Sequence, residues 1–471
     1  MKQSVKTKKK FKFPSTITLL ALIIIVVAIL TYIVPAGQYN RELNEATGNT
    51  VVIPDSYHTI NPSPVSYKTL LSTFYNAIIQ ASSLIAFVFV CGGAFGVITH
   101  TGAITAALNK MIEKLEGKEE WFIAIVMLVF CIGGASYGMA EETIPFVAIM
   151  VAIAIKMGYD PIVGVSMIII GVYTGYSGGA INPFNTGIAQ EICGLPIFSG
   201  MGLRIALSAG TLIIAIHHVS SYGKKYKKQI LAGEIEPDFE DYVADPALTG
   251  EIRAMTKMDM IILCVLFLTI AVLIFGVIKY QWYFEEMAAL FMTMGIVAGM
   301  IYYKGDFNST MNTFMDGAKG MAGTVLVVAM SRGVLLMMQS GGIMDTFVYW
   351  LSIPLSNMSS VFAAWGMYIS QGFINYLIPS SSGQATAVMP IFSSVADLIG
   401  ITRQTAILAY QSGDGFWNMI TPAHATTMAC IGIGGISFSK WFKYAFPLIL
   451  KWSVWVFIIL AYAVFTGYGP F

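Results

Sequence analysis

Charged side chains are scarce in this sequence. Asp, Glu, Lys and Arg together make up only 11% of the 471 residues, whereas 56% are hydrophobic. This composition excludes an ordinary soluble domain and predicts a polytopic helical protein that lies in a lipid bilayer. The net charge of +1 gives no sign of a nucleic-acid partner, because the charged residues are concentrated in the predicted loops.

Motifs for hydrolytic or ATP-driven chemistry are also missing from the sequence. The five cysteines show neither paired nor metal-like spacing, and His217-His218 has no third ligand near it in the sequence. No Walker motif and no Gly-x-Ser-x-Gly elbow occurs. We therefore expect no enzyme activity, no structural metal and no cofactor, and we keep Na⁺ and H⁺ as candidate coupling ions.

The N-terminal segment combines a basic start with a long apolar run. Residues 1–12 hold six lysines, and no charged residue follows between Pro14 and Asn40. The apolar core is longer than that of a signal peptide and lacks a good cleavage site, so a retained first helix over 17–34 is predicted. The lysines predict a cytoplasmic N-terminus, which makes residues 37–66 an external loop.

Two apolar runs in the first half are interrupted by small and polar residues, at 133–143 and at 177–186. Neither apolar half of the first run reaches the roughly 20 residues that cross a bilayer. We therefore predict a re-entrant hairpin over about 121–157 and a broken helix over about 161–193. Irregular backbone at membrane depth lines a cavity or is buried in protein, so these breaks are the candidate transport site.

The remaining segments divide the chain into five parts. The predicted first repeat covers 67–222, with single spans at 73–99 and 203–222, between an N-terminal part at 1–66 and a cytoplasmic linker at 223–257. Two connecting helices follow within 258–303. The predicted second repeat covers 304–471, with a helix at 321–339, a hairpin over about 361–399 and a broken helix over about 404–433.

Short motifs recur in the same order in both halves. Thr101-Gly102-Ala103-Ile104 returns 239 positions later as Ser340-Gly341-Gly342-Ile343, and the break at 182–186 returns at 421–426. One span precedes the first repeat and two precede the second, so the second repeat should enter the membrane from the opposite side. The predicted fold is an all-α polytopic membrane protein with two inverted-topology repeats, about nine transmembrane helices plus two re-entrant hairpins, and an external C-terminus.

The hairpin and break motifs also resemble a known family. Residues 138–143, 182–189, 331–333 and 377–383 are similar to the YfcC-like branch of the anaerobic C4-dicarboxylate carrier family, within the ion transporter superfamily. The resemblance covers nearly the whole chain. It implies a secondary active carrier, a homodimer and an elevator motion. It also implies a substrate that is a basic amino acid, as in arginine/ornithine antiporters, or a dicarboxylate.

Four charged side chains fall at predicted membrane depth: Glu141, Glu142, Arg332 and Asp414. An ionised side chain there costs about 2.5–3.5 kcal/mol, so it usually serves a pathway or finds a partner. One glutamate could accept N–H bonds at a helix start, but two carboxylates on one cap repel, so at least one should face the cavity. Arg332 either pairs with Asp414 or binds a substrate carboxylate. The acidic surplus favours a cationic substrate group or coupling cations.

Uncharged residues of the breaks are further ligand candidates. Pro183 and Pro422 cannot donate backbone hydrogen bonds, which leaves upstream carbonyls free. His424 is either a titratable group or a hydrogen-bonded residue at a helix end. The predicted ion-coupling residues are Asn182, Thr186, Asp414, Thr421 and Thr426. The predicted substrate-binding residues are Glu141, Glu142, Thr143, Asn182, Asn185, Arg332, Ser380, Ser381, Ser382, Gly383, Gln384, Asp414 and His424.

These features predict a secondary active transporter of the bacterial cytoplasmic membrane. Its substrate is expected to be a small charged amino acid, such as arginine or ornithine, moved by exchange or ion coupling. The alternative is sodium- or proton-coupled uptake of C4-dicarboxylates or other small carboxylates. A channel would need a polar stripe along several spans, whereas polarity here is concentrated in two breaks. An intramembrane enzyme could use only residues 380–382 with His424.

Overall fold

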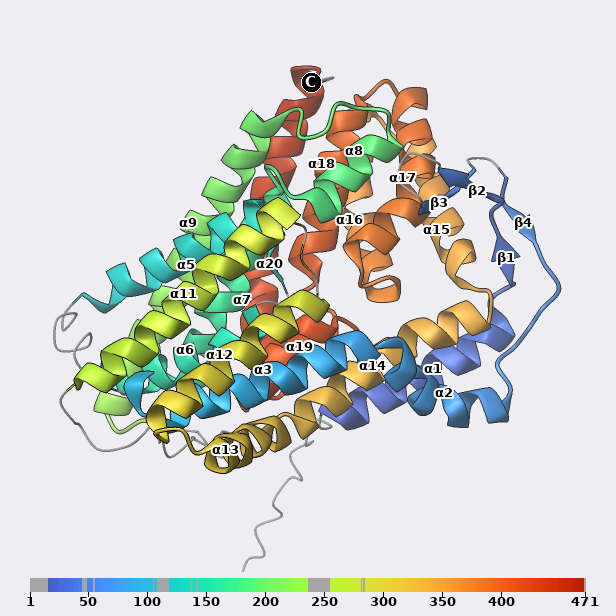
Figure 1. Cartoon of the computed structure of the whole chain (residues 1–471). Coiled ribbons are helices and arrows are strands. Elements are labelled where there is room, and N and C mark those ends of the chain that lie inside the picture. Colours follow the sequence, from blue (N-terminus) through green and yellow to red (C-terminus); the bar gives the residue numbers. More distant parts are fainter. Residues whose placement is uncertain are drawn as a thin grey trace, which may run out of the picture.

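The chain is mostly helical, with two small β ladders near its N-terminus (Figure 1). The computed structural model describes residues 16–44, 49–53, 56–104, 106–107, 118–136, 138–140, 143–235, 255–280, 282 and 284–469.

Among the described residues, the first half contains nine helical elements between Thr16 and Leu231. They are α1 (Thr16–Ile33), α2 (Tyr67–Gln80), α3 (Ser82–His100), α5 (Glu119–Ser136), α6 (Ile144–Lys156), α7 (Pro161–Gly178), the π-helix η2 (Pro183–Gly187), α8 (Ile188–Ile192) and α9 (Met201–Leu231).

The second half begins with two long apolar helices, and the order of its later elements follows that of the first half. Its elements are α11 (Lys257–Tyr280), α12 (Phe284–Tyr302), α13 (Phe307–Gly320), α14 (Ala322–Ser340), α15 (Met344–Ser352), the 3-10 helix η3 (Ile353–Asn357), α16 (Ser360–Leu377), α17 (Ser381–Leu398), α18 (Arg403–Trp417), α19 (Ala425–Ile433) and α20 (Phe438–Phe465).

The helices α7 and α18 form the centre of the molecule and run in opposite directions. Asp160 caps the start of α7 and accepts a hydrogen bond from Tyr222, near the end of α9, at 2.6 Å. Thr402 caps the start of α18 and donates to the carbonyl of Tyr468, just after α20, at 2.5 Å. Tyr468 also donates to the carbonyl of Gly200, which precedes α9. The two starts therefore lie at opposite ends of the α9–α20 pair.

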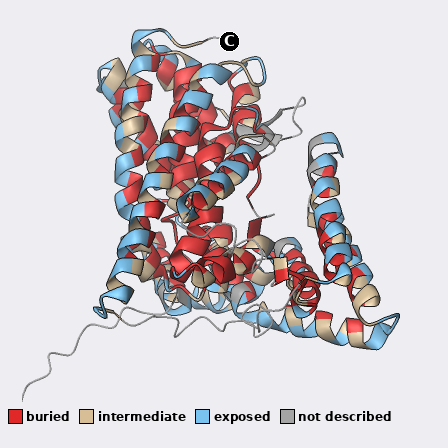
Figure 2. Ribbon diagram, turned by 90° about the vertical axis from the view of Figure 1, so that its left-hand side faces the viewer, coloured by how far each residue is buried: buried red, intermediate tan, exposed pale blue. Residues whose placement is uncertain are grey.

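Burial identifies α7 as an inner helix. All of its residues are buried inside the protein, although the helix is long and apolar enough to cross a membrane. Residues 404–416 of α18 are buried as well, despite their polar side chains. Figure 2 shows buried residues gathered in the interior, with exposed faces on the surrounding helices. The core of this membrane protein is thus built around two polar-interrupted helices.

A second group of helices, α1, α2, α3, α12, α13 and α14, lies along one side of this core (Figure 1). Glycines permit the close contact of α3 with α13. A Cβ on Gly96 would lie 2.6 Å from the Cα of Gly317, and one on Gly92 would lie 2.2 Å from the Met321 side chain. Small residues allow helix backbones to approach in membranes, where no hydrophobic force drives association.

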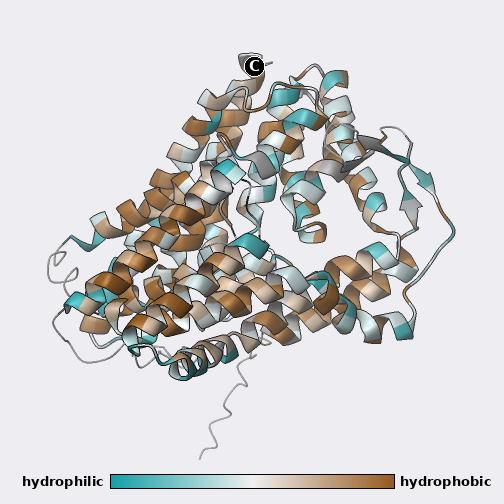
Figure 3. Cartoon of the chain, in the orientation of Figure 1, coloured by the Kyte–Doolittle hydropathy of each residue, from teal (hydrophilic) through white to brown (hydrophobic). Residues whose placement is uncertain are grey.

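Five helices among the described residues are long and apolar enough to cross a membrane, or six if α2 and α3 form one bent span. The five are α5, α7, α9, α12 and α20. Figure 3 shows apolar residues along α5, α11, α12 and α3, whereas hydrophilic segments occur along the β ladders. The molecule is therefore a multi-pass helical membrane protein.

Three expectations about helix bounds are wrong. The single helix predicted over 73–99 is bent by 57° between α2 and α3. Helix α5 has 18 residues and reaches the length of a span, because Gly134 stays helical against the Val172 carbonyl of α7. Helix α9 continues to Leu231, beyond the predicted linker start. Near this end of the helix, Lys224 forms an ion pair with Glu120 at 2.5 Å, and Lys227 forms one with Glu119 at 3.1 Å.

The predicted external loop contains secondary structure. Strands β1 (Gly37–Gln38) and β4 (His58–Thr59) pair antiparallel, as do β2 (Arg41–Asn44) and β3 (Asn49–Val52). Arg41 forms an ion pair with Asp345 of α15 at 2.7 Å, and the Tyr39 N–H donates to the same carboxylate at 2.9 Å. These contacts attach the N-terminal segment to the second half.

Candidate functional site

The break after α7 lies directly against α18. Gly179 adopts a left-handed conformation with φ 50° and ends α7. A Cβ on Gly415 would lie 2.2 Å from the Ser177 hydroxyl, so only glycine permits this crossing. Gln411 donates from Nε2 to the Gly178 carbonyl at 3.1 Å. Because Gln411 and Asp414 are three residues apart on one helix, both lie near the broken end of α7.

Asp414 is fully buried, and its hydrogen-bond partners among the described residues are uncharged. Its carboxylate accepts hydrogen bonds from the Ser381 hydroxyl, at the start of α17, and from Asn375 Nδ2 of α16 at 3.1 Å. Asn375 Nδ2 also donates to Asn418 Oδ1 at 2.8 Å, and Asn375 Oδ1 accepts from Thr421 Oγ1 at 2.9 Å. The second hairpin and the second break therefore meet at this carboxylate.

The first break forms its own polar cluster. Thr186 donates from Oγ1 to the Gly179 carbonyl at 2.7 Å, and its N–H donates to Asn185 Oδ1 at 2.5 Å. Gln411 donates to the Thr186 hydroxyl. Asn182 donates to the Gly134 carbonyl of α5 at 3.4 Å. These bonds hold an irregular, buried backbone in one conformation, because unpaired buried polar groups are costly.

Tyr176 connects the two clusters. Its carbonyl accepts from Asn185 Nδ2 at 3.0 Å, and its hydroxyl donates to Ser381 Oγ at 2.9 Å. Ser381 in turn donates to Asp414, while its carbonyl accepts from the Tyr410 hydroxyl at 2.6 Å. A continuous hydrogen-bonded chain thus runs from the first break to the buried carboxylate.

A buried arginine supports the first break from the side of α9. Arg204 is fully buried, and it donates from Nε to Gln411 Oε1 at 2.9 Å and from Nη2 to Gln404 Oε1 at 2.6 Å. It also donates to the Ser199 carbonyl. Arg204 is not predicted as a site residue from the sequence, because an arginine near a helix end usually marks the membrane interface. The seven-residue spacing of Gln404 and Gln411 in a buried helix was the available signal.

Two buried oxygens beside Asp414 and the breaks have no hydrogen-bond partner within the described parts of the chain. They are Gln384 Oε1 and Ser177 Oγ. Gln384 donates from Nε2 to Gln371 Oε1 at 2.8 Å, which fixes the orientation of its amide. Buried polar atoms are nearly always paired, so these two are candidate acceptors for a bound molecule.

Two other predicted site residues, Ser380 and His424, are helix caps. Ser380 caps α17 by accepting from the Gly383 N–H at 3.4 Å, and Ser382 is exposed. His424 caps α19 by accepting from the Thr427 N–H at 3.3 Å, and its Nε2 lies 3.3 Å from the Tyr173 hydroxyl.

Other predicted site residues are not among the hydrogen-bond partners of Asp414 or lie outside the described residues. Glu141 and Glu142 belong to the latter group. Thr143 is buried before α6 and donates to the Ala140 carbonyl at 2.5 Å. Arg332 lies on α14, which contacts α19, and Asp414 receives its hydrogen bonds from Ser381 and Asn375 rather than from Arg332. Thr426 is buried in the first turn of α19.

The arrangement offers oxygen ligands and one buried negative charge. No group of three or more His, Cys, Asp and Glu that could hold a metal occurs among the described residues. Broken helices with a carboxylate, hydroxyls and carbonyls at their crossing suit the binding of a small ion or charged solute. The fold and this site define a helical membrane protein of the carrier type.

Comparison with known proteins identifies the family. Residues 13–465 match the model of the DcuC family, the C4-dicarboxylate anaerobic carriers. The chain belongs to this family. The resemblance in the sequence motifs is thereby confirmed, and the family is one of carriers by its description.

Individual relatives cover nearly the whole chain. The "Putative basic amino acid antiporter YfcC" of Escherichia coli K12 is 29% identical over 499 residues, with 98% of each chain covered. A protein of Haemophilus influenzae without an assigned function is 28% identical, with 94% of this chain and 95% of the relative covered.

Two solved structures were also matched. The YdaH transporter of Alcanivorax borkumensis has a TM-score of 0.42 and 14% identity, with 96% of this chain and 99% of that chain covered. MtrF of Neisseria gonorrhoeae, an antimetabolite efflux pump by its description, has a TM-score of 0.43 and 14% identity, with 97% and 96% covered.

Proposed function

We propose that the protein is a secondary active transporter of a basic amino acid, such as arginine or ornithine, working by exchange or by coupling to Na⁺ or H⁺. The observation that carries this proposal is Asp414, a fully buried carboxylate at the crossing of two broken helices, whose partners in the described part of the chain are uncharged. A buried acid without a cationic partner suits a cationic substrate group or ion. The name given to the Escherichia coli relative agrees with this substrate class.

The element order supports two inverted-topology repeats. Helices α5, α6, α7 and α9 correspond in order to α16, α17, α18 and α20, and α7 runs opposite to α18. Helices of each half also pack against the other half. Helix α6 of the first half lies against α19 of the second, and α17 of the second lies against α8 and η2 of the first. We propose that alternating access occurs by an elevator-type motion of these elements. The protein would act as a homodimer, with the N-terminus of each chain in the cytoplasm and the C-terminus outside.

The hydrogen-bonded chain suggests how binding and coupling are linked. A cation at Asn185 and Thr186 would order the first break, and Tyr176 would transmit this order to Ser381 and Asp414. Na⁺ ligation by unwound carbonyls and hydroxyls is a recurring feature of transporters with broken helices. Charge movement adds about 2.3 kcal/mol per elementary charge per 100 mV of membrane potential.

A second candidate is sodium- or proton-coupled uptake of C4-dicarboxylates. It is favoured by the description of the family and by Arg332 on α14, whose guanidinium would bind a carboxylate. In that case Asp414 and the first break would serve ion coupling alone.

Counterflow in proteoliposomes distinguishes a basic amino acid from a C4-dicarboxylate as the substrate. Vesicles are preloaded with unlabelled arginine, ornithine, aspartate, succinate or acetate, and labelled arginine and succinate are followed with and without a sodium gradient. Arginine accumulation only in arginine- or ornithine-loaded vesicles is the expected result. Sodium-dependent succinate uptake without an arginine signal would reject the basic amino acid and support the dicarboxylate carrier.

A further inference from the structure

Two buried glutamine side chains between α16 and α17 use only half of their hydrogen-bonding capacity. Gln371 and Gln384 are 1% and 0% exposed. Gln384 donates from Nε2 to the Gln371 carbonyl at 3.0 Å and to Gln371 Oε1 at 2.8 Å. These bonds fix both amides, because a turned Gln384 amide would point its oxygen at the Gln371 carbonyl. Gln384 Oε1 and Gln371 Nε2 are left without a hydrogen-bond partner in the described part of the chain.

This amide pair lies beside the partners of Asp414. Gln371 precedes Asn375 by four residues on α16, and Gln384 follows Ser381 by three residues on α17. Residues at these spacings lie on the same face of a helix. Asn375 and Ser381 are the two donors to the Asp414 carboxylate. The pair therefore lies about one helical turn, or roughly 5.4 Å, from the groups that hold Asp414.

The packing of α18 against α16 brings the amide pair and Asp414 together. Gly413 directly precedes Asp414, and a Cβ on Gly413 would lie 2.5 Å from the Gln371 Cβ and 2.7 Å from the Tyr368 carbonyl. A side chain at position 413 would therefore separate the two helices. Glycine at this position places the buried amides and the buried carboxylate at one helix crossing.

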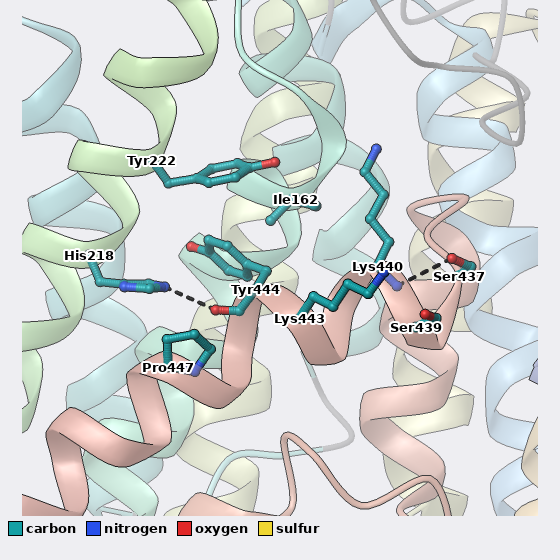
Figure 4. A pocket seen from close by; sticks show the side chains of 9 residues that line it. All are labelled: Ile162, His218, Tyr222, Ser437, Ser439, Lys440, Lys443, Tyr444 and Pro447. Carbon is teal, nitrogen blue, oxygen red and sulfur yellow. Dashed lines mark hydrogen bonds between the residues drawn. The ribbon is translucent and has the colours of Figure 1, made fainter. Parts of the chain in front are cut away.

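A cavity of about 700 Å³ between the starts of α7 and α20 and the last third of α9 is a separate space (Figure 4). Ile162 lines this cavity, whereas Ser177 lies at the other end of α7, against Gly415 of α18. About 15 residues of helix separate Ile162 from Ser177, or roughly 22 Å. The cavity therefore does not account for the unpaired atoms of the amide pair.

The two unpaired atoms match the two charged groups on the α-carbon of an amino acid. Gln371 Nε2 can donate to a carboxylate, and Gln384 Oε1 can accept from an ammonium group. Both atoms flank one hydrogen bond, just as both groups flank one carbon. The extended side chain of ornithine or arginine spans about one helical turn or more, which is the separation of the amide pair from the groups around Asp414.

We propose that Gln371 and Gln384 bind the α-carboxylate and α-ammonium groups of the substrate, while Asp414 binds its cationic side chain. The inference rests on the proposed function and restricts its substrate to α-amino acids. Agmatine and putrescine, which lack the carboxylate of arginine and ornithine, would leave Gln371 Nε2 unpaired. A dicarboxylate would offer no donor to Gln384 Oε1.

Counterflow of labelled arginine, inhibited by unlabelled arginine or agmatine, tests this subsite. The wild-type protein should bind agmatine about tenfold or more weakly than arginine, because a buried donor loses its charged acceptor. The double variant Gln371→Met/Gln384→Met keeps the side-chain volume and removes both amides. The ratio of the two inhibition constants should then fall to about threefold or less. Thermal stability should change little, since both partners of the hydrogen bond are removed together.

A second variant and a matched control complete the test. Gln371→Glu keeps an acceptor for Gln384 Nε2 but replaces the free donor with a carboxylate oxygen. It should weaken inhibition by arginine and strengthen inhibition by agmatine, which covers the case that the double variant does not fold. The control Gln80→Met/Gln339→Met makes the same exchange at exposed positions of α2 and α14 and should keep the wild-type ratio.

The outcomes distinguish this subsite from the proposed function. If the wild-type protein exchanges arginine but binds agmatine equally well, or if the Gln371 and Gln384 variants keep the wild-type ratio, the subsite is overturned and the amides hold water instead. The basic amino-acid function would stand in both cases. If the wild-type protein exchanges neither arginine nor ornithine, the proposed function is rejected and the subsite with it.

Discussion

At the residue scale, Asp414 is a carboxylate surrounded by amides and hydroxyls. Asp414→Asn keeps the size of the side chain but removes its charge. If Asp414 binds a cationic group, exchange should fall about tenfold or more, which corresponds to ~1.4 kcal/mol or more of lost transition-state stabilisation. Counterflow of labelled arginine measures this loss.

The matched control for Asp414→Asn is Asp316→Asn, at an exposed position paired only with Lys319. It should exchange at the wild-type rate. If Asp414→Asn were equally active, Asp414 would be a structural residue, and the proposed cation site would have to lie elsewhere.

Arg204 is a positioning residue at the same scale. A lysine keeps the charge but cannot reach the acceptors of Ser199, Gln404 and Gln411 together, since an ammonium lacks the planar fork of guanidinium. We expect Arg204→Lys to lower the free energy of unfolding by about 1–3 kcal/mol and to raise the apparent KM for the coupling ion, because Gln411 would lose its orientation toward Thr186. Thermal unfolding and ion titrations of uptake measure the two effects.

Arg403→Lys provides the comparison, because Arg403 is exposed and forms a surface ion pair with Asp397 at 2.6 Å. Its effect on unfolding should stay below about 1 kcal/mol. A loss of stability by Arg204→Lys with an unchanged ion KM would make Arg204 a purely structural residue.

At the element scale, Tyr176 joins the first break to the second hairpin. Tyr176→Phe removes the hydroxyl that donates to Ser381 and keeps the carbonyl that accepts from Asn185. In a double-mutant cycle with Ser381→Ala, the coupling free energy should be about 0.5–1.5 kcal/mol. The measurement is thermal or denaturant unfolding of all four proteins, and strict additivity would show that the two breaks are independent.

Sequence patterns predicted the breaks better than the contacts around them. Runs of glycine, serine, asparagine and proline interrupt apolar segments, and this identified the ends of α7 and α18 and the tip before α17. The bend between α2 and α3 carries no such signal, since Gln80, Ala81 and Ser82 are compatible with a continuous helix.

The partners of Asp414 could not be predicted either. Asn375 lies on α16, in a helix of otherwise ordinary composition, and its importance comes from its distance to Asp414 in the folded chain. Arg332 was one candidate partner, with a substrate carboxylate as the alternative, because charge complementarity is visible in sequence and three-dimensional proximity is not. Arg204 was missed because its position near the start of a predicted span is typical of the membrane interface.

At the scale of the whole molecule, the orientation in the membrane can be tested directly. Thr466 is exposed after α20, and Lys225 is exposed near the opposite end of the α9–α20 pair. In a background with Ser at the exposed Cys264, a membrane-impermeant maleimide should label Thr466→Cys in intact cells and Lys225→Cys only after permeabilisation. The reverse pattern would place the C-terminus in the cytoplasm.

The packing of α17, from the second half, against η2 and α8 of the first half has a consequence for synthesis. The segment that follows the first break, η2 and α8, is covered by α17, which leaves the ribosome about 190 residues later, or roughly 10–40 s at 5–20 residues per second. During that interval the polar backbone of the first break has reached the bilayer without its final cover. The nascent chain therefore depends on the insertion machinery or on lipid to shield it, and a chain truncated before α17 should be removed by membrane proteases.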